Sequence, residues 1–252
     1  MEDSHRTLSE ITSVILIGGL GTRLRSAVSD RPKVLAEIQG RPFLAFLLDQ
    51  LSATGIKRVV LCAGYKGEQV QAVFGHSYGP LDLFYSQETS PLGTGGALRL
   101  AIKLIESDPV LVMNGDSYCG ANLKAFWMWH TERNAAGSIL LTHTFQMKRF
   151  GRVQVDSDGL VLDFDEKGKR GGQGWINAGV YLLGQDFILS IPANRTVSLE
   201  REVFPQWVGR KLYGYESAGR FWDIGTPEDY AEAEQFFSTL KKGSREERAF
   251  SL

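Results

Sequence analysis

Three glycines and two cationic side chains near the start of the chain have the spacing of a phosphate-binding loop. The glycines lie within residues 18–21, directly after an apolar run at residues 14–17 that is typical of a buried strand. Glycine lets the backbone turn sharply and brings bare N–H groups against an anion. Arg23 and Lys33 follow and supply the positive charge that a triphosphate needs. The segment therefore predicts a loop that binds the phosphates of a nucleotide.

The spacing of the glycines distinguishes this loop from two other nucleotide-binding loops. A Walker loop requires Gly-x-x-x-x-Gly-Lys-Ser/Thr, and the sequence contains no such run. A dinucleotide-binding loop requires Gly-x-Gly-x-x-Gly; Gly19 and Gly21 begin this pattern, but Leu24 takes the place of the third glycine. An ordinary tight turn with two surface cations is the remaining alternative, and the length of the matching run argues against it.

Two aspartates stand at the ends of apolar, strand-like runs. Asp116 comes shortly after the apolar residues 110–113. Asp223 follows the apolar pair Phe-Trp and precedes Ile-Gly, in the run Phe-Trp-Asp-Ile-Gly at residues 221–225. Ligands collect at the carboxyl ends of strands in open α/β sheets. Mg²⁺ prefers one or two carboxylates together with phosphate oxygens and water. We expect the two aspartates to hold Mg²⁺ beside the loop, although a single aspartate in such a place can also cap a turn or a helix.

Strand and helix patterns alternate from residue 12 to about residue 145, which indicates βαβ units and a parallel sheet. We expect a helix that starts at Arg41-Pro42 and stops at Gly55. Two strands around the turn at residues 156–159 predict a β-hairpin. The strands are expected at residues 14–17, 59–62, 81–85, 110–113, 138–141, 153–155, 160–162 and 176–183.

The C-terminal part predicts one more helix, over about residues 226–240. Thr226 can cap it, Pro227 suits its first position, and acidic side chains follow in the first turn. The residues from Gly243 onward are charged and are expected to fray. His130 lies in an aromatic helical pattern and is expected on a helix face rather than in catalysis.

Composition limits the partners of the chain. Its 252 residues are 43% hydrophobic and 23% charged, with a formal net charge of -1, as in an ordinary globular α/β protein. The near-zero charge argues against nucleic acid or an anionic membrane as a partner. No apolar run reaches the roughly 18 residues of a membrane span, and the N-terminus lacks the core of a signal peptide. We therefore expect a cytoplasmic protein in which Cys62 and Cys119 are reduced core residues.

Together the motifs resemble the sugar-1-phosphate nucleotidylyltransferases. The first loop reads Gly-Gly-x-Gly-Thr-Arg-Leu and is followed by Pro-Lys, while Asn-Gly-Asp and Asp-Ile-Gly-Thr-Pro match the family at the two aspartates. Five motifs occur in the family's order, over roughly residues 12–240. The resemblance implies an α/β fold: a single-domain, Rossmann-like (GT-A-like) three-layer sandwich with a mostly parallel mixed central sheet and an inserted β-hairpin sugar-binding region. One domain would span residues 1–252, with its nucleotide-binding part at about 12–145 and its sugar-phosphate-binding part at about 146–225.

The resemblance also assigns residues in the middle of the chain to the sugar phosphate. In the family's Glu-Lys pair, matched by Glu166 and Lys167, the lysine binds the sugar phosphate and the glutamate contacts sugar hydroxyls. Without the resemblance, this pair reads as an exposed charged turn. Gly151 matches a glycine that lets the backbone approach the sugar, and Asn177 stands in the family's Asn-Ala-Gly-x-Tyr strand. A polar side chain in an apolar strand needs a partner, and a sugar hydroxyl is a candidate for Asn177.

The family's base-surrounding loop is matched by Gln87-Glu88 and by residues 91–97. The N–H donors of guanine favour the carboxylate of Glu88, whereas thymine or uracil suits the amide of Gln87. Neighbours on a strand point to opposite faces, so one of the two reaches the base, and we favour Glu88 with guanine. The expected nucleotide-binding residues are Leu16, Gly18, Gly19, Gly21, Thr22, Arg23, Lys33, Gln87, Glu88, Pro91, Gly93 and Thr94.

The resemblance implies an enzyme that makes a nucleotide-sugar and pyrophosphate from a nucleoside triphosphate, with GTP favoured, and a sugar 1-phosphate. Within the family, the sequence most resembles the D-glycero-D-manno-heptose 1-phosphate guanylyltransferases and then the mannose-1-phosphate enzymes. Uridylyl or thymidylyl transfer stays open. Relatives of this length often pair, which leaves a homodimer open. The implied catalytic residues are Arg23, Lys33 and Lys167, the sugar-phosphate residues Gly151, Glu166, Lys167 and Asn177, and the metal ligands Asp116 and Asp223.

Two rival functions remain. A glycosyltransferase shares a related nucleotide-binding sheet but should carry Asp-x-Asp at the metal strand, and Asn114 stands where the first acid would be. A regulatory, nucleotide-sensing subunit of the same fold usually lacks a metal aspartate or the loop lysine, whereas here every expected position is filled.

Overall fold

The computed structural model describes residues 7–249 except residues 20, 22, 25, 145–149 and 166–172, with side chains described up to residue 239. Among these residues, every helix is too short or too polar to span a lipid bilayer.

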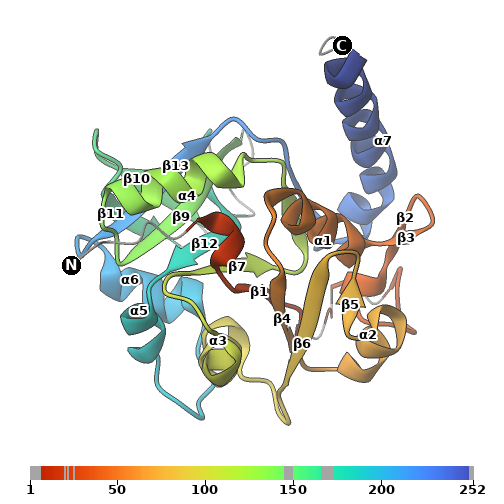
Figure 1. Cartoon of the computed structure of the whole chain (residues 1–252), viewed down its shortest axis with the longest axis horizontal. Coiled ribbons are helices and arrows are strands. Elements are labelled where there is room, and N and C mark those ends of the chain that lie inside the picture. Colours follow the sequence, from red (N-terminus) through yellow and green to blue (C-terminus); the bar gives the residue numbers. More distant parts are fainter. Residues whose placement is uncertain are drawn as a thin grey trace.

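A mixed sheet forms the middle layer of the protein (Figure 1). Among the described residues it has 10 strands, in the order β11-β10-β12-β7-β1-β4-β6-β5, with β9 pairing β12 and β13. The strands β6, β4, β1 and β7 are parallel to one another, and β12 returns antiparallel to β7. The strands are β1 (Ser13–Leu16), β4 (Arg58–Ala63), β5 (Ser77–Tyr78), β6 (Leu81–Gln87), β7 (Val110–Asn114), β9 (Gly137–Thr144), β10 (Arg152–Val155), β11 (Val161–Asp165), β12 (Gly174–Leu183) and β13 (Leu212–Ser217).

Helices cover both faces of this sheet, because side chains along each central strand alternate between two apolar clusters. Ile15 of β1 belongs to the cluster under α1 (Phe43–Thr54) and α4 (Leu123–Glu132), whereas its neighbour Val14 belongs to the cluster under α3 (Gly93–Leu100), α5 (Gln185–Leu189) and α6 (Phe204–Trp207). The three-layer α/β architecture expected from the sequence is therefore confirmed. Shorter elements are η1 (Leu8–Glu10), η2 (Lys33–Leu35), α2 (Gly67–Phe74), η3 (Ala101–Leu104) and the π-helical η5 (Leu199–Val203).

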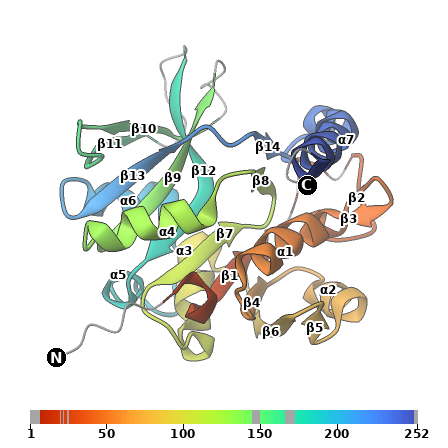
Figure 2. The same ribbon diagram turned by 45° about the horizontal axis from the view of Figure 1, so that its top comes forward.

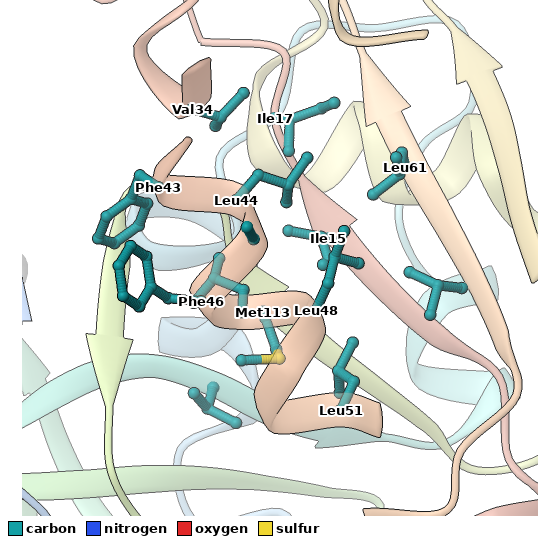
Figure 3. Packing of buried hydrophobic residues seen from close by; sticks show 14 of the residues in the cluster. Ile15, Ile17, Val34, Phe43, Leu44, Phe46, Leu48, Leu51, Leu61 and Met113 are labelled. Atoms are coloured by element: carbon teal, nitrogen blue, oxygen red, sulfur yellow. The ribbon is translucent and has the colours of Figure 1, made fainter. Parts of the chain in front are cut away.

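The packing of α1 shows how the core holds the first strand in place (Figure 3). Leu44 and Leu48 of α1 are fully buried in the same cluster as Ile15 and Met113. Burying a side chain of this size contributes about 1.5–3 kcal/mol. The helix ends as predicted at Gly55, whose φ of 89° is the left-handed conformation that favours glycine after a helix.

The predicted strands are all present, and the hairpin of β10 and β11 is antiparallel as expected. The carboxylate of Asp156 accepts hydrogen bonds from the N–H groups of Asp158 and Leu160, which closes the hairpin turn. In Figure 2 this hairpin lies at the opposite end of the molecule from α2. Cys62 and Cys119 are buried and unbridged, as predicted.

Three predicted boundaries are wrong. Arg41–Pro42 forms the short strand β3, paired with β2 (Glu37–Ile38), and the helix begins one step later at Phe43. The expected base-surrounding loop becomes helical at Gly93, where α3 begins, although glycine disfavours helices. Tertiary contacts override that preference, because the N–H groups of Gly95 and Gly96 donate to the carbonyl of Val197.

The third wrong boundary is the end of the last helix. α7 (Pro227–Ala249) starts as predicted, with Thr226 Oγ1 accepting from the N–H of Asp229, but it continues through the segment expected to fray. Lysine, arginine, glutamate and alanine favour helix, and a single glycine costs only about 1 kcal/mol. The helix extends away from the rest of the molecule (Figure 1).

Candidate functional site

A cavity of about 360 Å³ opens at the carboxyl ends of β1 and β7. The chain continues from β1 to β4 on one side and from β7 to β9 and β12 on the other, so the connections that follow these two paired strands diverge and leave a crevice. The cavity is lined by Leu16, Ile17, Gly18, Gly19, Gly21, Arg23, Lys33, Val34, Glu88, Pro91, Gly93, Thr94, Ala97, Asn114, Gly115, Asp116 and Gly225. Of the described residues predicted to bind the nucleotide, Gln87 alone is missing from this lining; Thr22 lies outside the described residues.

The glycine loop owes its path to the absence of side chains. Gly21 has a φ of 58°, which a residue with a Cβ adopts only with strain. A Cβ on Gly18 would lie 2.8 Å from Oε1 of Glu88, and one on Gly115 would lie 2.7 Å from the carbonyl oxygen of Leu16. Glycine at these positions therefore lets the loop, the strand end and the Glu88 carboxylate meet around the cavity.

Lys33 and Asp116 form an ion pair in the wall of this cavity. Lys33 Nζ donates to Asp116 Oδ2 at 2.9 Å, and the two side chains are 11% and 41% exposed. Burial raises the pKa of Asp116, but the charge and hydrogen bond of Lys33, helped by Arg23, outweigh it and hold that pKa below its ordinary value. Asp116 is therefore ionised at neutral pH and faces the two cations of the loop.

Asp223 comes to Asp116 through a second, small sheet. It ends β14 (Phe221–Asp223), which pairs with β8 (Ser117–Cys119), and the next residue, Ile224, donates its N–H to the carbonyl of Asp116 at 3.0 Å. Burial, and then the negative charge of Asp116, raise the pKa of Asp223 to about 6. The two predicted metal ligands are thus close enough to repel each other, which is the condition that a bound cation relieves.

The described residues contain no group of three or more His, Cys, Asp or Glu side chains that could hold a metal ion. Two carboxylates fit Mg²⁺, which takes its remaining ligands from phosphates and water. They would fit a fully protein-bound Zn²⁺ or Ca²⁺ site poorly.

Glu88 and Gln87 point away from each other, as predicted for neighbours at the end of a strand. Glu88 lines the cavity and accepts a hydrogen bond from the N–H of Leu92 at 3.0 Å, and burial raises its pKa. Gln87 is exposed, and its amide donates to the carbonyl of Gly64 at 3.3 Å. The structure therefore places the carboxylate, rather than the amide, inside the cavity.

Two of the predicted sugar-binding residues lie near β10 and β12: Gly151 directly precedes β10, and Asn177 is on β12. The N–H of Asn177 donates to the carbonyl of Gly151 at 3.0 Å. The Asn177 side chain donates to the hydroxyl of Tyr181 at 2.8 Å and accepts from the N–H of Gly179 at 2.8 Å. Asn177, which the sequence predicted to need a hydrogen-bond partner, therefore has its partners within the protein. Glu166 and Lys167 lie outside the described residues.

Sequence reasoning missed several residues of the cavity wall. Asn114 and Gly115 stand in the motif that predicted Asp116, so the position of the motif after a strand could have revealed them. Val34 and Ala97 carry no local signal, because they reach the cavity only through the packing of η2 and α3.

The sequence pattern of the Nucleotidyl transferase family matches residues 12–239, which include the whole cavity wall. The chain belongs to the nucleotidyl transferase family. It is therefore an enzyme, and the cavity has the expected position for a ligand of this nucleotidyl transferase, at the switch point of its sheet.

Individual relatives share this architecture over most of the chain. A D-glycero-alpha-D-manno-heptose 1-phosphate guanylyltransferase of Aneurinibacillus thermoaerophilus is 35% identical over 224 residues, which cover 88% of this chain and 96% of the relative. A mannose-1-phosphate guanylyltransferase of Mycobacterium tuberculosis is 37% identical over 225 residues, covering 88% of this chain and 63% of the relative. The crystal structure of HddC from Yersinia pseudotuberculosis complexed with GMP-PN matches with a TM-score of 0.78 and 35% identity, over 90% of this chain and 99% of HddC.

Proposed function

We propose that this nucleotidyl transferase moves a guanylyl group from GTP to a sugar 1-phosphate, releasing pyrophosphate and forming a GDP-sugar. One observation carries the base assignment: the carboxylate of Glu88 lies in the cavity wall, whereas Gln87 is exposed and is not part of that lining. A carboxylate accepts the N1 and N2 N–H groups of guanine, whereas uracil and thymine present a carbonyl on each side of their single N–H.

The favoured acceptor is D-glycero-D-manno-heptose 1-phosphate, with mannose 1-phosphate as the alternative. Support comes from the relatives, since the heptose enzyme is covered over 96% of its length and the mannose enzyme over 63%. We assign the nucleotide to residues of the part at about 12–145 and the sugar phosphate to residues of the part at about 146–225, including Gly151, Glu166, Lys167 and Asn177.

The chemistry needs alignment and charge more than a proton acceptor. An oxygen of the sugar phosphate attacks the α-phosphorus of GTP in line, a new P–O bond forms, and the bond to the bridging oxygen of pyrophosphate breaks. The attacking oxygen is already an anion, so the reaction requires no general base. Catalysis then consists of holding two anionic substrates together and neutralising their charge.

Each cation of the site has a role in this scheme. Arg23 holds the β- and γ-phosphates that depart, and Lys33 neutralises the α-phosphate as it becomes crowded. The N–H groups of the glycine loop bind phosphate oxygens. Lys167 brings the sugar phosphate to the reacting phosphorus.

Asp116 and Asp223 would hold the divalent metal, and Mg²⁺ fits their donor set. When bound, Mg²⁺ supplies positive charge to the phosphate oxygens. Lys33 donates to one carboxylate oxygen of Asp116, and burial together with the charge of Asp116 raises the pKa of Asp223.

The decisive experiment is pyrophosphate release from GTP, UTP, dTTP or ATP, each with heptose 1-phosphate or mannose 1-phosphate and Mg²⁺. The proposal expects the highest kcat/KM for GTP with the heptose ester. Release that requires no sugar phosphate, or a preference for UTP or dTTP, contradicts it. GTP binding without turnover would instead indicate the nucleotide-sensing subunit, and consumption of a GDP-sugar would indicate the glycosyltransferase.

A further inference from the structure

A buried carboxylate that the proposed chemistry does not use lies behind the cavity. Glu200 belongs to the π-helical turn η5 and is only 9% exposed. Its Oε2 accepts hydrogen bonds from Thr94 Oγ1 at 2.7 Å and from Ser198 Oγ at 3.0 Å, and its Oε1 accepts from the Tyr181 hydroxyl at 3.2 Å. A buried charge persists only where such partners satisfy it, and short π turns often occur at functional sites.

The partners of Glu200 come from two different parts of the site. Thr94 lies in the first turn of α3 and lines the nucleotide cavity. Tyr181 lies on β12, and its hydroxyl accepts from the Asn177 amide at 2.8 Å. A chain of hydrogen bonds therefore runs from the cavity wall, through Glu200, to the residue assigned to the sugar.

A third branch returns from Tyr181 to the cavity. Asn114, which lines the cavity, directs its amide nitrogen to the Tyr181 hydroxyl at 3.5 Å. Its Oδ1 is buried and has no hydrogen-bond partner among the described residues. The Tyr181 hydroxyl therefore accepts from Asn114 and Asn177 and donates its hydrogen bond to Glu200.

The backbone before Glu200 is fixed to the same cavity wall. The N–H of Gly95 donates to the carbonyl of Val197 at 2.9 Å, and the N–H of Val197 donates to the carbonyl of Leu92 at 2.8 Å. The N–H of Leu199 donates to Thr94 Oγ1 at 2.9 Å, so the Thr94 hydroxyl must donate in turn to Glu200. The start of α3 thus has its position set by the segment that carries Glu200.

We propose that Glu200 is a positioning residue that couples the two substrate sites, by holding the start of α3 at a fixed position relative to Tyr181 and Asn177 on β12. The inference rests on the proposed function. In-line attack requires the two phosphates to be held in register, and a displacement of about 1 Å can lower the rate about 100-fold. A carboxylate suits this position because all three side-chain partners are hydroxyl donors.

Glu200→Gln is the first test, because glutamine keeps the size of the side chain but brings an N–H₂ donor into a group of hydroxyl donors. We expect kcat/KM to fall about 30-fold or more for both substrates. Glu202→Gln is the matched control: Glu202 is exposed in the same turn, and its Oε1 accepts from the Ser198 N–H at 2.9 Å. The control should stay within about two-fold of the wild type, because glutamine keeps that acceptor. Unchanged kinetics in Glu200→Gln, or a loss confined to one substrate, overturns the proposal.

A double-mutant cycle separates coupling from general loosening. Thr94→Val and Tyr181→Phe each remove one hydroxyl that donates to Glu200. If Glu200 couples the two sites, the double variant loses less activity than the product of the two single losses, because the first change has already broken the link. In the Glu200→Gln background the same two changes should act independently. Multiplicative losses in the wild-type background contradict the proposal.

Amide hydrogen exchange gives a readout that needs no turnover. Glu200→Gln should raise exchange both at residues 92–97 and at residues 177–182, and Glu202→Gln should raise neither. A wild type that releases no pyrophosphate refutes the proposed function, and the exchange result then decides the coupling by itself. Increased exchange in both segments supports the coupling, whereas an increase in one segment overturns it.

Discussion

Polar side chains are arranged in opposite ways around the nucleotide cavity and in the β12 region. Around the cavity, Lys33, Asp116 and Glu88 carry charged groups that line the open space, Lys33 and Asp116 as an ion pair and Glu88 as the acceptor of the Leu92 N–H. On β12, Asn177 and Tyr181 direct their polar groups inward to each other and to Glu200. Charged groups that face a cavity are free to act on a ligand, whereas groups that satisfy one another fix the positions of the elements that carry them.

The cavity side should show the largest effect on catalysis. Lys33→Ala should lower kcat/KM by about 10²–10³-fold, because it removes the positive charge at the reacting phosphate. Stability should fall by about 1 kcal/mol or less, since Asp116 keeps access to water with 41% of its side chain exposed. Pyrophosphate release and thermal unfolding measure the two effects. Lys57→Ala, at an exposed lysine, is the control, and comparable activity in the Lys33 and Lys57 variants would refute the role of Lys33.

The base-reading assignment should give the next largest effect. Glu88→Gln should lower kcat/KM for GTP about 10–100-fold, the loss of a charge-assisted hydrogen bond of about 1.5–3 kcal/mol. Gln87→Ala should change it by no more than about two-fold, because Gln87 is exposed outside the cavity lining. Steady-state kinetics with GTP and UTP measure both variants. A larger loss from Gln87→Ala than from Glu88→Gln would reverse the assignment.

Substitutions on β12 should lower the free energy of unfolding. Asn177→Ala removes one hydrogen-bond donor to the Tyr181 hydroxyl and the acceptor of the Gly179 N–H, and we expect the free energy of unfolding to fall by about 1–3 kcal/mol. Gln154→Ala, at an exposed position of β10, should cost about 0.5 kcal/mol or less. Urea unfolding compares the two variants. Equal stability would show that the inward hydrogen bonds of β12 contribute nothing to the fold.

The smallest effect concerns the pH dependence of stability, at a buried histidine near β9 that is also hydrogen-bonded inside the protein. His130 is 4% exposed and lies 2.7 Å from Ser138 Oγ through Nδ1, and burial lowers its pKa to about 4. The unfolded chain binds this proton near pH 6.5 and the folded chain only near pH 4, so stability falls as the pH drops between these values. At pH 5 the loss from this group is about 2 kcal/mol at most.

His130→Gln should flatten that part of the pH dependence while leaving the dependence above pH 7 unchanged. Unfolding free energies at pH 5 and pH 7.5 measure it in both proteins. The same difference between the two pH values in wild type and variant would show that His130 titrates normally in the folded chain.

The sequence predicted the cavity better than the β12 cluster because of how each is encoded. Gly18 and Arg23 share one short loop, and the strand pattern before it locates that loop at the carboxyl end of a strand. Asp223 was also predictable, although β14 brings it to Asp116 from far along the chain, because a motif surrounds it.

Glu200 carries no such signal. Its bond to Thr94 joins residues 106 positions apart, and it exists only because η5 packs on α3. The same packing turns the glycine-rich residues after Leu92 into a helix that their propensity disfavours. Asn177 finds its partners within its own strand, on Tyr181 and Gly179, whereas the apolar pattern of that strand showed only that it needed a partner.

The account as a whole is tested most directly by a crystal structure of the protein with GTP and Mg²⁺. The account predicts the triphosphate along Gly18–Gly21 with its phosphates near Arg23 and Lys33, the purine edge against Glu88, and the metal between Asp116 and Asp223. A base bound away from Glu88, or a triphosphate bound outside the cavity between β1 and β7, would contradict it.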